Sequence, residues 1–177
     1  TGAGADSLTI TSDGGDAQNT ADTAAFLSIV VTDNAAANAI VLNDSNNGDS
    51  LTLVVTGDII ADVASTANDL TILVDATATD DGGDTTLILN GATLDLGQGT
   101  GITLNSDAND IATLRFNGGS AQTLEGNITA SADGEGVVII EGSSLTTQDD
   151  IGVAGTGVAS IQIAASKTLT QKAATGD

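Results

Sequence analysis

Carboxylates supply nearly all of the side chains in this sequence that could do chemistry. The chain carries 24 Asp and Glu residues against 3 Lys and Arg, and it has no His and no Cys. Without His, the usual general base near neutral pH and the commonest transition-metal ligand are missing. Without Cys there is no thiol nucleophile, no thiolate metal site and no disulfide framework. The chemistry to consider is therefore that of acidic side chains.

Acidic turns can bind calcium, because Ca²⁺ prefers hard oxygen ligands. The segment DSNNGDS at 44–50 places oxygen donors at alternate positions, loosely like a calcium loop, but it lacks the bidentate Glu that ends one. The candidate ligands of a possible Ca²⁺ are Asp13, Asp16, Asp44, Asp49, Asp80, Asp81 and Asp84, with Asp107 and Asp110. Asp-Gly pairs are also ordinary turn-formers, so turn propensity explains them without a metal.

Pairs of carboxylates could also serve a glycosidase or a polysaccharide lyase, if two were held a few ångströms apart. The acidic residues that suggest this are Asp80, Asp81, Glu125, Glu135, Asp149 and Asp150. Sugar-binding clefts usually add aromatic platforms, and the only aromatic residues are Phe26 and Phe116. The alternative interpretation, solvated turn carboxylates, is favoured. We therefore expect no enzyme and no catalytic residue.

The net charge of −21 restricts the possible partners. Arg115, Lys167 and Lys172 are the only basic residues, too few to neutralise phosphates, so nucleic-acid binding is not expected. Anionic membranes would repel the chain, and no apolar run approaches the 18 residues of a transmembrane helix, so no direct membrane insertion is expected. Salt or divalent cations would screen such a charge, which suits an extracellular or cell-surface location in a bacterium or archaeon.

Alternation of apolar and polar residues with a period of two dominates the chain and predicts about fourteen short strands. The best helical window, Asn34–Ala39, is too short to form a stable helix. The predicted strands are Ser7–Thr11, Phe26–Thr32, Ala39–Leu42, Leu51–Thr56, Leu70–Val74, Thr85–Asn90, Ala92–Leu96, Gly101–Asn105, Ala112–Phe116, Gln122–Ile128, Val137–Glu141, Ser144–Thr147, Ser160–Ile163 and Lys167–Thr170.

The spacing of these strands predicts one elongated all-β domain over 1–177. Segments beginning at Ala112, Gly136 and Ala159 recur about every 23–24 residues, and the strands at Leu51, Leu70 and Leu87 follow one another at about 17–19 residues. Such spacings are typical of solenoid coils. A core without large aromatic anchors also favours a thin, layered interior. We expect a parallel β-solenoid of short coils; the alternative is an antiparallel β-sandwich or jelly roll, which also gives regularly spaced strands.

The stretch from Ala112 to Lys172 resembles a known class of repeats. The run TLRFNGGSAQTLEGNITASADGEG, then VVIIEGSSLTTQDDIG and VASIQIAASKTLT, is similar to repeats of bacterial autotransporter passengers and rickettsial-type outer-membrane surface antigens. In those repeats a strand pair with the pattern FNG…QT…G leads through a DG-G turn to the next coil. The resemblance implies an exported β-strand-repeat surface protein that is adhesive or coat-forming.

Strands at both extremities lack a helical or polar cap. Ser7–Thr11 and Lys167–Thr170 are ordinary strands, and uncapped strand edges recruit further strands. We therefore expect an extracellular structural subunit that assembles with identical copies into a filament, tube or surface layer, with Leu8, Ile10 and Leu169 at the assembly edges. The alternative is a monomeric adhesin or passenger segment. Terminal strands covered by the subunit's own chain would contradict the assembly hypothesis.

Overall fold

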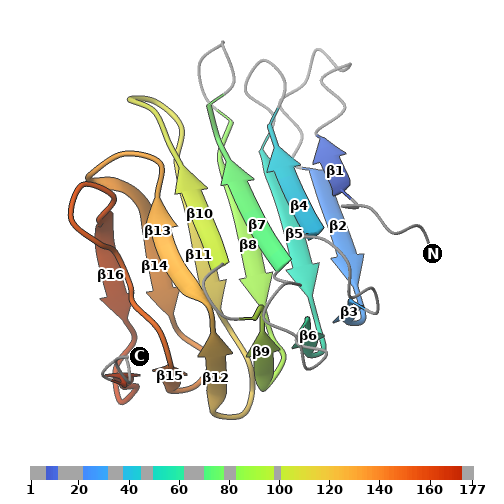
Figure 1. Cartoon of the computed structure of the whole chain (residues 1–177), viewed down its shortest axis with the longest axis vertical. Coiled ribbons are helices and arrows are strands. Elements are labelled where there is room, and N and C mark those ends of the chain that lie inside the picture. The colour runs from blue at the N-terminus through green and yellow to red at the C-terminus, as the bar shows by residue number, and fades with distance from the viewer. Residues whose placement is uncertain are drawn as a thin grey trace.

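The strands wind into a stack of coils in which every strand pair is parallel (Figure 1). The structure, a computed structural model, describes residues 7–11, 22–31, 38–44, 50–61, 70–77, 83–97 and 101–172. Within these ranges it holds seventeen strands and no helix. The predicted parallel β-solenoid is therefore confirmed. The antiparallel sandwich is wrong, because strands that neighbour each other in a sheet belong to successive coils and run in the same direction.

Three parallel sheets, here called A, B and C, form the sides of the stack. Sheet A consists, in order, of β1 (Ser7–Thr11), β4 (Asn38–Asn43), β7 (Leu70–Asp75), β10 (Gly101–Asn105) and β13 (Asn127–Ala130). Sheet B consists of β2 (Asp22–Phe26), β5 (Leu51–Val55), β8 (Thr85–Leu89), β11 (Ala112–Phe116), β14 (Glu135–Ile140) and β16 (Val158–Ile163). Sheet C consists of β3 (Ile29–Val30), β6 (Ile59–Ile60), β9 (Thr93–Asp95), β12 (Gln122–Glu125), β15 (Leu145–Thr147) and β17 (Leu169–Gln171).

Coils 1 to 5 each contribute one strand to each sheet, so coil 1 is β1–β2–β3 and coil 5 is β13–β14–β15. In coil 6 an isolated bridge between Ile128 and Ile151 stands where a strand of sheet A would be, followed by β16 and β17. In Figure 1 coil 1 lies at the right of the stack, in blue, and coil 6 at the left, in red-brown. The two end coils therefore face away from each other.

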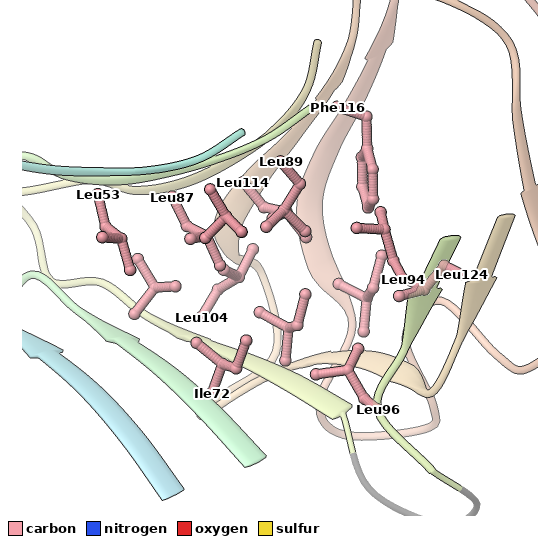
Figure 2. Packing of buried hydrophobic residues seen from close by; sticks show 14 of the residues in the cluster. Leu53, Ile72, Leu87, Leu89, Leu94, Leu96, Leu104, Leu114, Phe116 and Leu124 are labelled. Atoms are coloured by element: carbon pink, nitrogen blue, oxygen red, sulfur yellow. The ribbon is translucent and has the colours of Figure 1, made fainter. Parts of the chain in front are cut away.

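In-register pairing places similar side chains above one another in the interior. One column of sheet A runs Leu8, Ile40, Ile72, Ile102, Ile128 and Ile151. Figure 2 shows Leu53, Leu87 and Leu114 side by side along sheet B, with side chains of the other two sheets facing them. Because each coil buries its inward residues between two neighbouring coils, small aliphatic side chains fill the core without aromatic anchors.

Glycines form a second column at the corner between sheets B and C. Gly57, Gly91, Gly118 and Gly142 occupy this corner in four successive coils. A Cβ at any of them would approach atoms of the preceding coil closer than 3.0 Å, a separation that real Cβ atoms essentially never show. The corner therefore admits only glycine at these positions, which lets the coils stack closely.

Several predicted strand limits differ from the structure at the corners. Phe26–Thr32 was expected as one strand, but the chain turns at Leu27 and Ser28 and divides into β2 and β3. Gln122–Ile128 divides into β12 and β13 at Gly126, which has a φ of 126°. The short β6 was not predicted. Apolar alternation continues through a tight corner, so the pattern alone does not mark the change of sheet.

The coil period is also longer in the first half than the sequence suggested. The 17–19-residue spacing upstream separates strands of different sheets, since Leu51 begins β5 and Leu70 begins β7. In the first half, Asn38 pairs with Leu70 of the next coil, 32 residues further along the chain. In the second half this separation falls to 23 residues, between Val137 and Ser160. The expected 23–24-residue period of the second half is confirmed.

Candidate functional site

The end of the stack formed by coil 6 exposes side chains that point toward the interior. Ile161 and Ile163 pair in register with Val138 and Ile140, which are 0% exposed. Ile161 and Ile163 are nevertheless 40% and 47% exposed, because within the described residues no further strand pairs with β16. Leu169 of β17 is partly buried against the core. We call β16, β17 and Ile151 the C-terminal face.

The opposite end exposes the interior in the same way. Leu8 is 47% exposed although its neighbour in the column, Ile40, is buried. Ile10, Phe26 and Ile29 are only partly buried and pack against the core from one side. Within the described residues, β1, β2 and β3 each pair with one neighbouring strand, so their outer edges carry unpaired backbone groups. We call these three strands the N-terminal face.

These two faces contain all three residues that the sequence predicted as assembly edges. Leu8 and Ile10 lie in β1 and Leu169 lies in β17. Sequence reasoning missed Phe26, Ile161 and Ile163, whose exposure depends on their position in the stack. The alternation within VASIQI already indicated which of its residues share a face, but only the register shows that this strand ends a sheet.

Several described carboxylates at the turns accept hydrogen bonds from backbone amides, some from an adjacent coil and others from the same turn. The Asp84 carboxylate accepts from the Ile111 amide at 2.9 Å, and that of Asp149 accepts from the Gly126 amide at 2.7 Å. Asp133 accepts from the Gly157 amide at 3.2 Å. These contacts cap turn amides that the sheet ladders leave unpaired. The carboxylates thus tie neighbouring coils together.

The acidic residues considered for glycoside chemistry are not all described. Asp149 and Asp150, although adjacent in sequence, have different partners: the Gly126 amide for the first and the Gln171 side-chain amide, at 2.9 Å, for the second. Glu135 accepts from the Ala132 amide at 3.1 Å. Asp80 and Asp81 lie outside the described residues. These hydrogen bonds are those of turn carboxylates.

The candidate calcium ligands fall, along the chain, between a strand of sheet A and the next strand of sheet B. Of the seven main candidates the structure describes only Asp44, which is buried, and the exposed Asp84. The remaining five lie outside the described residues: Asp13, Asp16, Asp49, Asp80 and Asp81. Asp107, in the equivalent connection of coil 4, accepts from the Asn109 and Asp110 amides. Within the described ranges no three acidic side chains group as a metal site would require, and calcium binding stays a prediction.

Arg115 binds Glu141 of the next coil on the outer surface of sheet B. Its Nε donates to Oε1 and its Nη2 to Oε2, both at 2.8 Å. The hydrogen bond to Glu141 and the attraction between the charges raise the pKa of Arg115, and partial desolvation opposes them. Arg115 thus has an acidic partner on the surface of its own chain.

Comparison with known proteins assigns no relative. No family model, no curated protein and no solved structure matches the chain. Among the described residues there is also no helix long and apolar enough to cross a bilayer. The resemblance of residues 112–172 to autotransporter passenger repeats therefore stays a prediction. The functional argument depends on the geometry of the two end faces.

Proposed function

We propose that this chain is an extracellular structural subunit that self-assembles through its end coils into a filament, tube or surface layer. One observation carries the proposal. Interior columns that are fully buried in the middle of the stack end in side chains that are about half exposed, such as Leu8 and Ile163. A second copy placed on either face would bury them as each internal coil is buried.

Backbone pairing supports the same interface. β16 and β2 are the edge strands of the six-stranded sheet B, and β17 and β3 those of sheet C. Each edge presents N–H and C=O groups that an added strand can satisfy. Apolar side chains and backbone donors thus coincide on the same surfaces, and both gain by strand addition.

The charge of the subunit favours association at the ends over association along the sides. With a net charge of −21, the flanks of two copies repel each other, whereas the end faces described here are largely apolar. Salt or divalent cations would weaken that repulsion, as in an extracellular medium. A structural role is also consistent with a chain that has neither His nor Cys.

Electron microscopy of the purified protein in negative stain, together with sedimentation, tests the proposal. Wild-type protein should form extended assemblies, and Ile163→Glu should abolish them because it places a charge in the C-terminal face. Thr86→Glu, on the outer surface of β8 in the middle of the stack, is the matched control and should leave assembly intact. Thermal unfolding checks that both variants fold.

Two outcomes would contradict the proposal. Monodisperse small particles of wild-type protein at every salt and calcium concentration would favour the monomeric adhesin or passenger segment instead. Loss of assembly in Thr86→Glu but not in Ile163→Glu would move the interface from the ends to the side of sheet B.

A further inference from the structure

The two end coils differ sharply in charge. Residues 151–172, which form coil 6, contain Lys167 and Lys172 and no Asp or Glu. Residues 1–31, which contain coil 1, have four Asp and no Lys or Arg. The only other basic residue, Arg115, is in coil 4 and is bound to Glu141. Coil 6 therefore carries basic residues where coil 1 has none, although Asp133 and Asp150 accept hydrogen bonds from its Gly157 amide and its Gln171 side chain.

This asymmetry distinguishes the possible arrangements of two copies. Joining two C-terminal faces would bring lysines toward lysines, and joining two N-terminal faces would bring together two segments whose only charged side chains are acidic. Joining a C-terminal face to an N-terminal face places the lysine-bearing coil beside the acidic one. Only this third arrangement is electrostatically complementary.

The direction of the strands favours the same arrangement. Every strand pair in the described part of the stack is parallel. A head-to-tail copy keeps all strands in that direction, so β16 of one copy pairs with β2 of the next as an internal neighbour would. Two identical faces related by a two-fold axis would instead pair antiparallel, which occurs nowhere among the described strands.

The interior columns set the register of this contact. In sheet B one column runs from Phe26 through four buried residues to Ile163, and the next runs from Ala24 to Ile161. Continuing both columns into a second copy places Ile163 against Phe26 and Ile161 against Ala24. In the first column the large Phe26 side chain then contacts Ile163, and in the second the small Ala24 side chain contacts Ile161.

We infer that the subunits join head to tail, with β16 of one copy pairing in parallel with β2 of the next and the lysine-bearing coil 6 facing the acidic coil 1. This inference depends on the proposed function and adds the polarity and register of the contact. A head-to-tail contact is heterologous and does not close, so it produces polar filaments. Attraction between the two faces offsets part of the repulsion between copies of net charge −21, and both the attraction and the repulsion weaken as the ionic strength rises.

Cysteine cross-linking tests polarity and register together. In this register Ala25 and Gln162, both exposed on the outer side of sheet B, become direct neighbours. Paired strands lie about 4.8 Å apart, within the Cα separations that disulfides span. The protein has no Cys of its own, so each introduced thiol is unique. The variants are Ala25→Cys and Gln162→Cys, with Thr113→Cys in coil 4 as control.

The variants are oxidised separately and as an equimolar mixture in which one is isotopically labelled, and mass spectrometry identifies the linked pairs. We expect the Ala25→Cys–Gln162→Cys disulfide to exceed either homodisulfide at least tenfold, and Thr113→Cys to link to neither. Homodisulfides in equal or larger yield, with wild-type protein still forming assemblies, would overturn the polarity and leave self-assembly standing. Wild-type protein that never assembles would overturn both.

A charge variant gives an independent readout. Lys172→Gln should slow assembly about threefold or more at low salt, measured by light scattering, and should approach the wild-type rate at high salt. Arg115→Gln removes one positive charge from the middle of the stack and should have a much smaller effect. An equal effect of both substitutions would show that net charge, and not end complementarity, controls the rate.

Discussion

Phe26 and Ile163 are the opposite ends of one interior column. Between them the column passes through Val55, Leu89, Phe116 and Ile140, all of which are 0% exposed. Side chains of equivalent orientation therefore have very different surroundings, depending only on their distance from an end of the stack. The same geometry that exposes the ends of the column buries its middle.

Substitutions along this column should lose stability according to position. Leu89→Ala should lower the free energy of unfolding by about 2–5 kcal/mol, because the cavity lies between two packed coils. Ile163→Ala, at the open end, should cost less than about 1.5 kcal/mol. Urea denaturation of dilute, monomeric protein measures both. Equal losses would mean that the end of the column is already covered.

Replacing a glycine by alanine at the corner between sheets B and C should destabilise the protein. A Cβ at Gly142 would collide with the backbone of Asn117 and Gly118, so Gly142→Ala should cost about 1–3 kcal/mol through displacement of the coil below. Gly119→Ala is the control, because nothing lies within 4 Å of its Cβ position. Thermal unfolding should separate the two variants, and a Gly142→Ala protein as stable as Gly119→Ala would contradict the close stacking.

The buried side chain of Gln122, at the corner between sheets B and C, should contribute to the stability of the fold. Its buried amide donates to the carbonyl oxygens of Leu89 and Gly91, at 3.0 and 2.8 Å, and accepts from the Gly118 amide at 3.1 Å. Gln122→Leu removes these bonds and leaves buried backbone groups without them, at a cost of about 1–3 kcal/mol. Gln162→Leu, on an exposed outer position, should change monomer stability little. Chemical denaturation of the two variants gives the comparison.

The Arg115–Glu141 pair should contribute little to stability despite its good geometry. Both side chains are partly exposed, at 39% and 28%, so a double-mutant cycle with Arg115→Gln and Glu141→Gln should give a coupling below about 1 kcal/mol that decreases with salt. The bond raises the pKa of Arg115 above its ordinary value, so from the arginine side the coupling is complete at neutral pH and is lost only as pH rises through that raised pKa. A coupling of several kcal/mol would contradict this.

Much of the fold was predictable from local pattern. Alternation located most of the strands. It missed β6 and all of β2 except Phe26, and it carried FLSIVVT and QTLEGNI across corners. The 23–24-residue repeat of the second half indicated the solenoid, because equal connections there keep the period regular. The coil period of the first half was not apparent from the sequence, because its connections between sheets A and B are longer and unequal in length.

By itself, the sequence determined that the protein consists of short aliphatic strands, is strongly acidic and lacks His and Cys, because these properties follow from residue type and alternation. The tertiary structure decided that the strands stack as parallel coils and do not form an antiparallel sandwich. Only the tertiary structure decided which coils meet: that Glu141 is the partner of Arg115, that Gln122 bridges coils 3 and 4, and that Ile163 ends a column. These facts depend on register between segments 23 to 35 residues apart, which unequal loops set and no local pattern encodes.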